Sequence, residues 1–136
     1  MNVAALRGHI ERLAAEHDIV VYAQARRPAQ AYALRDAEEI FIAPVRSHIS
    51  YAVALHELGH FLGRYQTSRH TVVREQWAWN WARASALIWT PAMERHARKA
   101  MAYIWATQSP RMSASTKIRA AAVRQRASRN ARPDES

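Results

Sequence analysis

Residues 47–63 of this 136-residue chain read SHISYAVALHELGHFLG, and their apolar side chains recur at helical spacing. Ser47 or Ser50 is suited to cap the start of a helix, because a serine hydroxyl can accept a backbone N–H there. Gly63 is suited to end the helix. The pattern therefore predicts a helix over roughly residues 48–62.

An HExxH motif lies inside this predicted helix, with His56 and His60 four positions apart. These positions lie on one face of a helix, so both imidazoles can bind a single metal ion. Glu57 projects beside them, toward a water molecule on that ion, as a metal-dependent hydrolase requires. The alternative is that both histidines are ordinary surface or core residues of an amphipathic helix.

The composition limits the size of the protein and the chemistry of its site. A chain of 136 residues predicts one domain that buries its apolar side chains without disulfides. Because the chain has no cysteine, a zinc site must be built from His, Asp or Glu. Charged residues interrupt both the N-terminal segment and the later apolar stretches. We therefore expect a soluble, cytoplasmic protein with no membrane partner.

Positive charge is concentrated toward the C-terminus. The chain has 20 Lys and Arg residues against 11 Asp and Glu, a net charge of +9, and the span from Arg111 to Arg132 is basic and free of acids. Such a segment can contact nucleic-acid phosphates, and it can equally serve solubility or bind acidic partners. Specific DNA recognition is disfavoured, because aromatic residues are not interleaved with the charges and no reading helix is recognisable.

The first part of the chain predicts an α+β domain. Residues 3–17 have a helical apolar face, and apolar or β-branched runs at 19–23, 31–34 and 39–43 predict three strands. The short connections between these runs favour a small antiparallel sheet. Everything after Pro44 is expected to be helical.

Three helices are expected after the HExxH helix. A long, largely buried one runs from Thr71 to about Trp89, another begins at Pro91, and a weaker one runs from Ser109 toward Val123. Four of the five tryptophans recur at helical spacing with other apolar residues and are expected in the core: Trp77, Trp81, Trp89 and Trp105.

The HExxH pair needs a third ligand, because a catalytic zinc usually takes three protein ligands and keeps one position for water. The longer pattern HExxHxxGxxH fails at its last position, where Gln66, a poor zinc ligand, stands. His70 lies in a polar stretch, where a histidine is usually solvated. Glu75 is favoured, because a metal would neutralise an acid on a buried helix. The alternative for Glu75 is a solvent-facing ion pair with Arg74 or Arg83.

The small residues Ala78 and Ala82 follow Glu75 on the same helical face and would allow a close approach to the HExxH helix. Together these residues resemble the ImmA/IrrE family of small gluzincin-like metallopeptidases. The HExxH stretch is similar to the family's metal helix. The stretch EQWAWNWA, residues 75–82, is similar to its second motif, an acid followed by Ala-Asn, a variable residue, an aromatic residue and Ala. Trp79 stands where that motif has Asn, and Asn80 is displaced by one position.

The resemblance covers about residues 1–90 and implies a zincin-like domain in which the HExxH helix packs on a second, ligand-bearing helix. It implies Zn²⁺ held by His56, His60 and Glu75. Glu57 would accept a proton from the zinc-bound water and pass it to the leaving amine. A further donor to the oxyanion is expected among three residues that the sequence does not rank: His48, Tyr65 and His70.

The function implied by the resemblance is zinc-dependent proteolysis of a regulatory protein such as a transcriptional repressor, in a phage or mobile-element setting. The expected organisation is a single metallopeptidase-like domain over residues 1–127, with a core at 1–90 and a helical extension at 91–127. A disordered basic tail is expected at 128–136. The main alternative is a non-enzymatic regulatory protein with a structural or vestigial metal site, whose basic tail binds nucleic acid or an acidic protein. A metal-dependent hydrolase with another substrate is the third reading.

Overall fold

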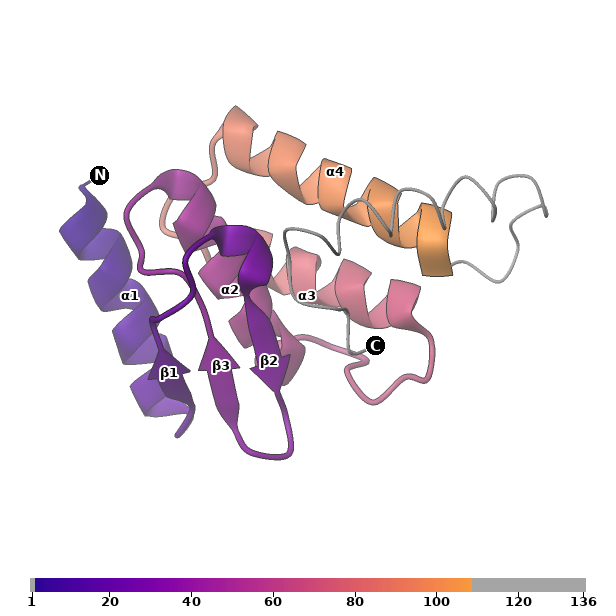
Figure 1. Cartoon of the computed structure of the whole chain (residues 1–136), viewed down its shortest axis with the longest axis horizontal. Helices are drawn as coiled ribbons and strands as arrows, with labels where there is room; N and C mark the ends of the chain where they lie inside the picture. Colours follow the sequence, from indigo (N-terminus) through magenta and orange to yellow (C-terminus); the bar gives the residue numbers. More distant parts are fainter. Residues whose placement is uncertain (1, 109–136) are drawn as a thin grey trace.

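The computed structural model describes residues 2–108, which form an α+β arrangement of helices around a small sheet (Figure 1). The predicted helix from Ser109 toward Val123 and the tail at 128–136 lie outside the described residues. The elements follow one another as α1 (Val3–Glu16), β1 (Val20–Tyr22), the 3₁₀ helix η1 (Pro28–Gln30), β2 (Tyr32–Leu34), β3 (Glu39–Phe41), α2 (His48–Leu62), α3 (Thr71–Ser85) and α4 (Pro91–Gln108).

The three-stranded sheet is mixed, so the prediction of an antiparallel sheet is only partly correct. Its strand order is β1-β3-β2, and Ile40 of β3 lies opposite Val21 of parallel β1 and Ala33 of antiparallel β2. The hairpin between β2 and β3 follows from their short polar connection. Residues 23–31, by contrast, are long enough to carry the chain past the position that β3 later fills. The central place suits β3, because Ile40 is fully buried.

Helix α1 has the apolar face that the sequence predicts. Leu6, Ile10 and Ala14 are buried on it and belong to the hydrophobic core. The side chain of Asn2 caps the helix by accepting a hydrogen bond from the backbone N–H of Ala5 at 2.8 Å. This helix contacts both α2 and β1, so it closes one side of the domain (Figure 1).

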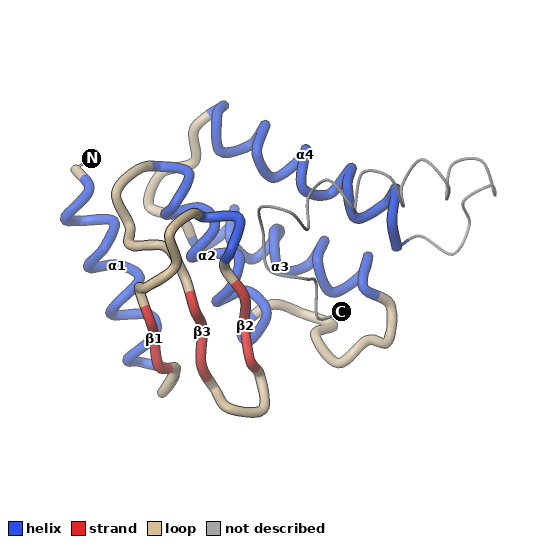
Figure 2. Tube along the Cα trace, viewed as in Figure 1, coloured by secondary structure: helices blue, strands red, loops and turns tan. Residues whose placement is uncertain are grey.

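Helix α2 is the centre of the domain and has the predicted bounds. The hydroxyl of Ser47 accepts the N–H of Ser50 while the hydroxyl of Ser50 accepts the N–H of Ser47, which fixes the first turn. Every residue from Ser50 to Gly59 is buried. Figure 2 shows why: α1, the sheet, α3 and α4 surround this helix, and it contacts β2 and all three other helices.

The buried hydroxyl of Tyr51 joins α2 to two distant segments. It accepts the backbone N–H of Leu87 at 3.0 Å, and its own proton is then free for Nδ1 of His9, which lies 2.7 Å away. Burial lowers the pKa of His9, and this agrees with a neutral imidazole that accepts the hydroxyl proton. Tyr51 is thus satisfied in the core despite being fully buried.

Helix α3 is shorter and less buried than predicted, and the tryptophan prediction is only partly correct, since Trp81 and Trp89 pack against the core without being fully buried. The helix ends at Ser85, Trp105 on α4 is 50% exposed, and three more of the expected core tryptophans are only partly buried. The buried tryptophan is Trp79, at 3% exposure. It lies next to Ala78 on the face toward α2, so small side chains on α3 determine which face packs inward. The prediction rested on apolar residues at helical spacing, and this spacing does not determine which face of α3 packs against α2.

The close approach of α2 and α3 that the small residues predict is confirmed. A Cβ atom added at Gly59 would lie 2.5 Å from the carbonyl oxygen and 2.9 Å from the Cα of Ala78. At Gly63, an added Cβ would lie 3.0 Å from the carbonyl oxygen of Trp77. The two helix backbones therefore touch at Gly59, between the two histidines of the HExxH motif.

No helix among residues 2–108 is long and apolar enough to cross a membrane.

Gly59→Ala is expected to destabilise the fold by about 2 kcal/mol, because overpacking against a backbone outweighs the better helix propensity of alanine. The matched control is Gly8→Ala in α1, where the nearest atom to an added Cβ is the movable Nη1 of Arg12 at 3.3 Å. That change should stabilise the protein by up to about 1 kcal/mol. Urea unfolding of both variants measures the difference, and equal stability of Gly59→Ala and wild type would contradict the close contact.

Candidate metal centre

The structure brings the HExxH motif of α2 together with the acid of α3. Nε2 of His56 lies 2.6 Å from Oε2 of Glu75, and Nε2 of His60 lies 3.4 Å from Oε1 of the same carboxylate. The two arginines considered as partners for Glu75, Arg74 and Arg83, have other partners. Arg83 pairs with Glu94 on α4, and Arg74 donates to the carbonyl of Ser68 and the hydroxyl of Thr71.

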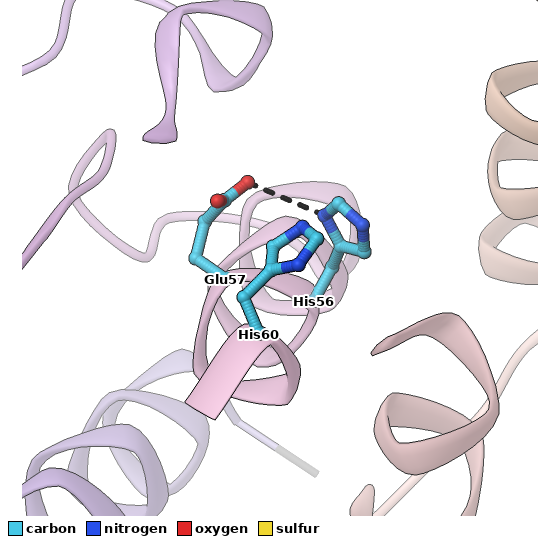
Figure 3. A group of neighbouring side chains, drawn as sticks. All are labelled: His56, Glu57 and His60. Carbon is cyan, nitrogen blue, oxygen red and sulfur yellow. Dashed lines mark hydrogen bonds and ion pairs between the residues drawn. The ribbon is translucent and has the colours of Figure 1, made fainter. Parts of the chain in front are cut away.

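Glu57 lies on the same side of α2 as the two imidazoles (Figure 3). Its Oε2 is 3.3 Å from Nδ1 of His56, and one ligand atom from each of His56, Glu57 and His60 lies within 4.8 Å of the others. The group of three side chains can hold a metal ion. All three are shielded from solvent, with side-chain exposures of 8–14%.

The donor set suits zinc. Imidazole nitrogen and carboxylate oxygen are both common zinc ligands, and ligands about 2.1 Å from a tetrahedral zinc lie about 3.4 Å from one another. The separation of His60 Nε2 and Glu75 Oε1 equals that value. The 2.6 Å separation of His56 Nε2 and Glu75 Oε2 is that of a hydrogen bond, so a proton joins this pair.

The two imidazoles and the carboxylate of Glu75 shift one another's pKa values. Burial alone would lower the pKa of His56, but the charge of Glu75 and hydrogen bonds to Glu57 and Glu75 outweigh it and raise this pKa to about 10. The pKa of His60 is also raised, against burial, by its bond to Glu75. Burial alone would raise the pKa of Glu75, yet the charge of His56 and the imidazole hydrogen bonds hold it well below its usual range. A divalent cation would meet a carboxylate that is already ionised.

None of the other residues proposed from the sequence joins this group. His70 is an exposed residue at the start of α3, and Tyr65 is 56% exposed, with its ring edge-on to Trp77 at 5.0 Å. His48 opens α2, eight residues before His56, which places it about 12 Å away along the helix axis. Within residues 2–108, none of these three side chains makes a hydrogen bond or ion pair with His56, Glu57, His60 or Glu75.

Two residues near the site were missed from the sequence. The indole of Trp79 stacks on the imidazole of His56, with ring centroids 4.2 Å apart and an angle of 17°. His96 of α4 lies edge-on to the same indole at 6.0 Å. Burial and the nearby charge of His56 lower the pKa of His96. The signal for Trp79 was present, since it stands where the family motif has Asn, whereas His96 lies in a part of the chain that the resemblance does not cover.

Comparison with known proteins adds no family to this geometry. No protein-family model, no curated protein and no solved structure matches the chain. The support for a metal centre is therefore the arrangement of His56, Glu57, His60 and Glu75 itself.

Proposed function

We propose that this protein is an intracellular zinc-dependent endopeptidase of the ImmA/IrrE type, with Zn²⁺ held by His56, His60 and Glu75. The observation that carries the proposal is the carboxylate of Glu75, which comes from a second helix and lies against Nε2 of both HExxH histidines. Two histidines and one glutamate are the ligand set of a catalytic zinc site that keeps a fourth position open.

The two acids of the site have different surroundings, and this difference supports different roles. Glu75 faces the Nε2 atoms of both imidazoles, whereas Glu57 contacts Nδ1 of His56 alone. Nδ1 of His60 is already bound to Gln66. The nitrogens that both rings have in common for a shared ion are therefore the Nε2 atoms, beside Glu75. Glu57 then lies beside the proposed ligands without being one of them, which suits a general base.

The chemistry follows from these positions. Zinc, when bound, supplies a Lewis acid that polarises the scissile carbonyl and lowers the pKa of a water molecule toward neutrality. Glu57 takes a proton on its carboxylate as the water attacks, and returns that proton to the leaving amine. Burial of the Glu57 side chain, at 8% exposure, keeps competing solvent away from this carboxylate.

The substrate that we propose is a regulatory protein such as a transcriptional repressor. The basic segment from Arg111 to Arg132, a proposed contact for nucleic acid or an acidic protein, lies outside the described residues. The competing function is a non-enzymatic binding protein in which the same metal centre is structural. That alternative predicts bound zinc without cleavage, and binding that weakens steeply with salt.

Metal removal tests the proposal. The full chain loaded with zinc is incubated with a peptide library made from digested cellular protein, and new termini are identified by mass spectrometry. Cleavage should disappear when a chelator strips the protein and should return when about one equivalent of zinc is added. Cleavage by verified metal-free protein would contradict a metallopeptidase. Zinc retention without any cleavage would favour the binding-protein alternative.

A further inference from the structure

Gln66 fails the longer HExxHxxGxxH pattern as a zinc ligand, yet the structure places its side chain directly beside His60. The residue is 5% exposed and lies in the segment between α2 and α3. Its Oε1 is 3.0 Å from Nδ1 of His60. Its Nε2 donates to the carbonyl oxygens of Arg64 at 3.0 Å and Arg74 at 2.9 Å. The buried amide thus makes three hydrogen bonds, one through its oxygen and two through its nitrogen.

The two carbonyl contacts determine which way the amide faces. Only the amide nitrogen can donate to carbonyl oxygens, so Oε1 must be the atom that faces His60. Oε1 is an acceptor only, and it therefore requires a proton on Nδ1 of His60. In the neutral imidazole the lone pair is then on Nε2, the atom that lies toward Glu75.

The segment that carries Gln66 is itself fixed. Nη1 of Arg35, in the turn between β2 and β3, donates to the backbone carbonyl of Gln66 at 3.0 Å. The contact with Arg74 reaches the first turns of α3. The backbone of Gln66 is thus tied to the β2–β3 turn, its side-chain amide is held by the carbonyls of Arg64 and Arg74, and the amide oxygen contacts His60 in turn.

We infer that Gln66 is a positioning residue of the metal centre, which selects the His60 tautomer with Nδ1–H and aims Nε2 at the shared position beside Glu75. This inference rests on the proposed metal site and deepens it. A partner that fixes the non-ligating nitrogen of a histidine ligand orients the ring and makes the ligating nitrogen available, and its loss typically costs about 10- to 100-fold in metal affinity.

A pair of variants separates this role from simple bracing of the loop. Gln66→Leu and Gln66→Glu both remove the N–H donors to Arg64 and Arg74, but only Gln66→Glu keeps an oxygen acceptor for His60. Zinc affinity is measured on the full chain by competition with a chromophoric chelator. Gln66→Leu should bind zinc about 10- to 100-fold more weakly than wild type, and Gln66→Glu should stay within about threefold of it. Equal loss in both variants, or no loss in Gln66→Leu, would overturn the inference.

A measurement on the wild type keeps the inference testable if Gln66→Leu does not fold. In metal-free protein labelled with ¹⁵N, the Nδ1 proton of His60 should exchange with water much more slowly than the ring protons of the exposed His17. Equally fast exchange would show that Gln66 does not hold the ring. If the wild type binds no zinc, the proposed function fails on its own, and this exchange rate alone decides whether Gln66 positions His60.

Discussion

Glu57→Gln is expected to reduce peptide cleavage by about 100- to 10,000-fold, because an amide cannot accept the proton that a general base removes from water. Zinc content should stay unchanged. Glutamine has nearly the same volume as glutamate, and its carbonyl oxygen can still accept a hydrogen bond from Nδ1 of His56. The loss should therefore appear in turnover at saturating substrate, with binding of substrate largely retained.

Two other results for Glu57→Gln would contradict this role. Unchanged cleavage would mean that another group acts as the base. Loss of zinc together with activity would mean that Glu57 is itself a ligand, in the alternative set with His56 and His60. Glu11→Gln on the exposed side of α1 is the matched control, because it removes the same charge from a helix that carries none of the proposed ligands. It should change neither zinc content nor turnover.

Features that depend on neighbouring residues were predicted well from the sequence. The bounds of α2 were correct because the Ser47 cap, the apolar period and Gly63 all act within a few residues of one another. The choice of Glu75 over His70 as the third ligand rested on the argument that a metal would neutralise an acid on a buried helix, and it stays a prediction. The structure places Glu75 between the two histidines.

Features that depend on distant contacts could not be predicted in the same way. The parallel pairing of β1 with β3 depends on the path of residues 23–31, and composition does not determine that path. The inward position of Trp79 involves a stack on His56, which lies 23 positions earlier on the facing helix. From the sequence, Gln66 could be judged only as a possible zinc ligand. Its contact with His60 depends on an amide orientation set by two backbone carbonyls, and one of these, that of Arg74, lies eight residues further along the chain.

Glu75→Ala is expected to weaken zinc binding by more than about 100-fold, because loss of a direct ligand costs more than loss of a residue that merely supports one. The variant also leaves two buried imidazoles without their shared carboxylate. Glu94→Ala is the matched control, because the partners of this acid are Arg83, Arg98 and the indole N–H of Trp89 rather than a histidine. Glu94→Ala should keep its zinc.

The most direct test is the metal content of the full chain purified without a histidine tag, determined by mass spectrometry of the ions for wild type, His56→Ala and Glu75→Ala. The proposed site predicts about one zinc ion per wild-type chain and none in either variant. A wild type without metal would contradict the metallopeptidase. Zinc retained in Glu75→Ala but lost in His56→Ala would contradict the role of Glu75 and leave His56, Glu57 and His60 as the ligands.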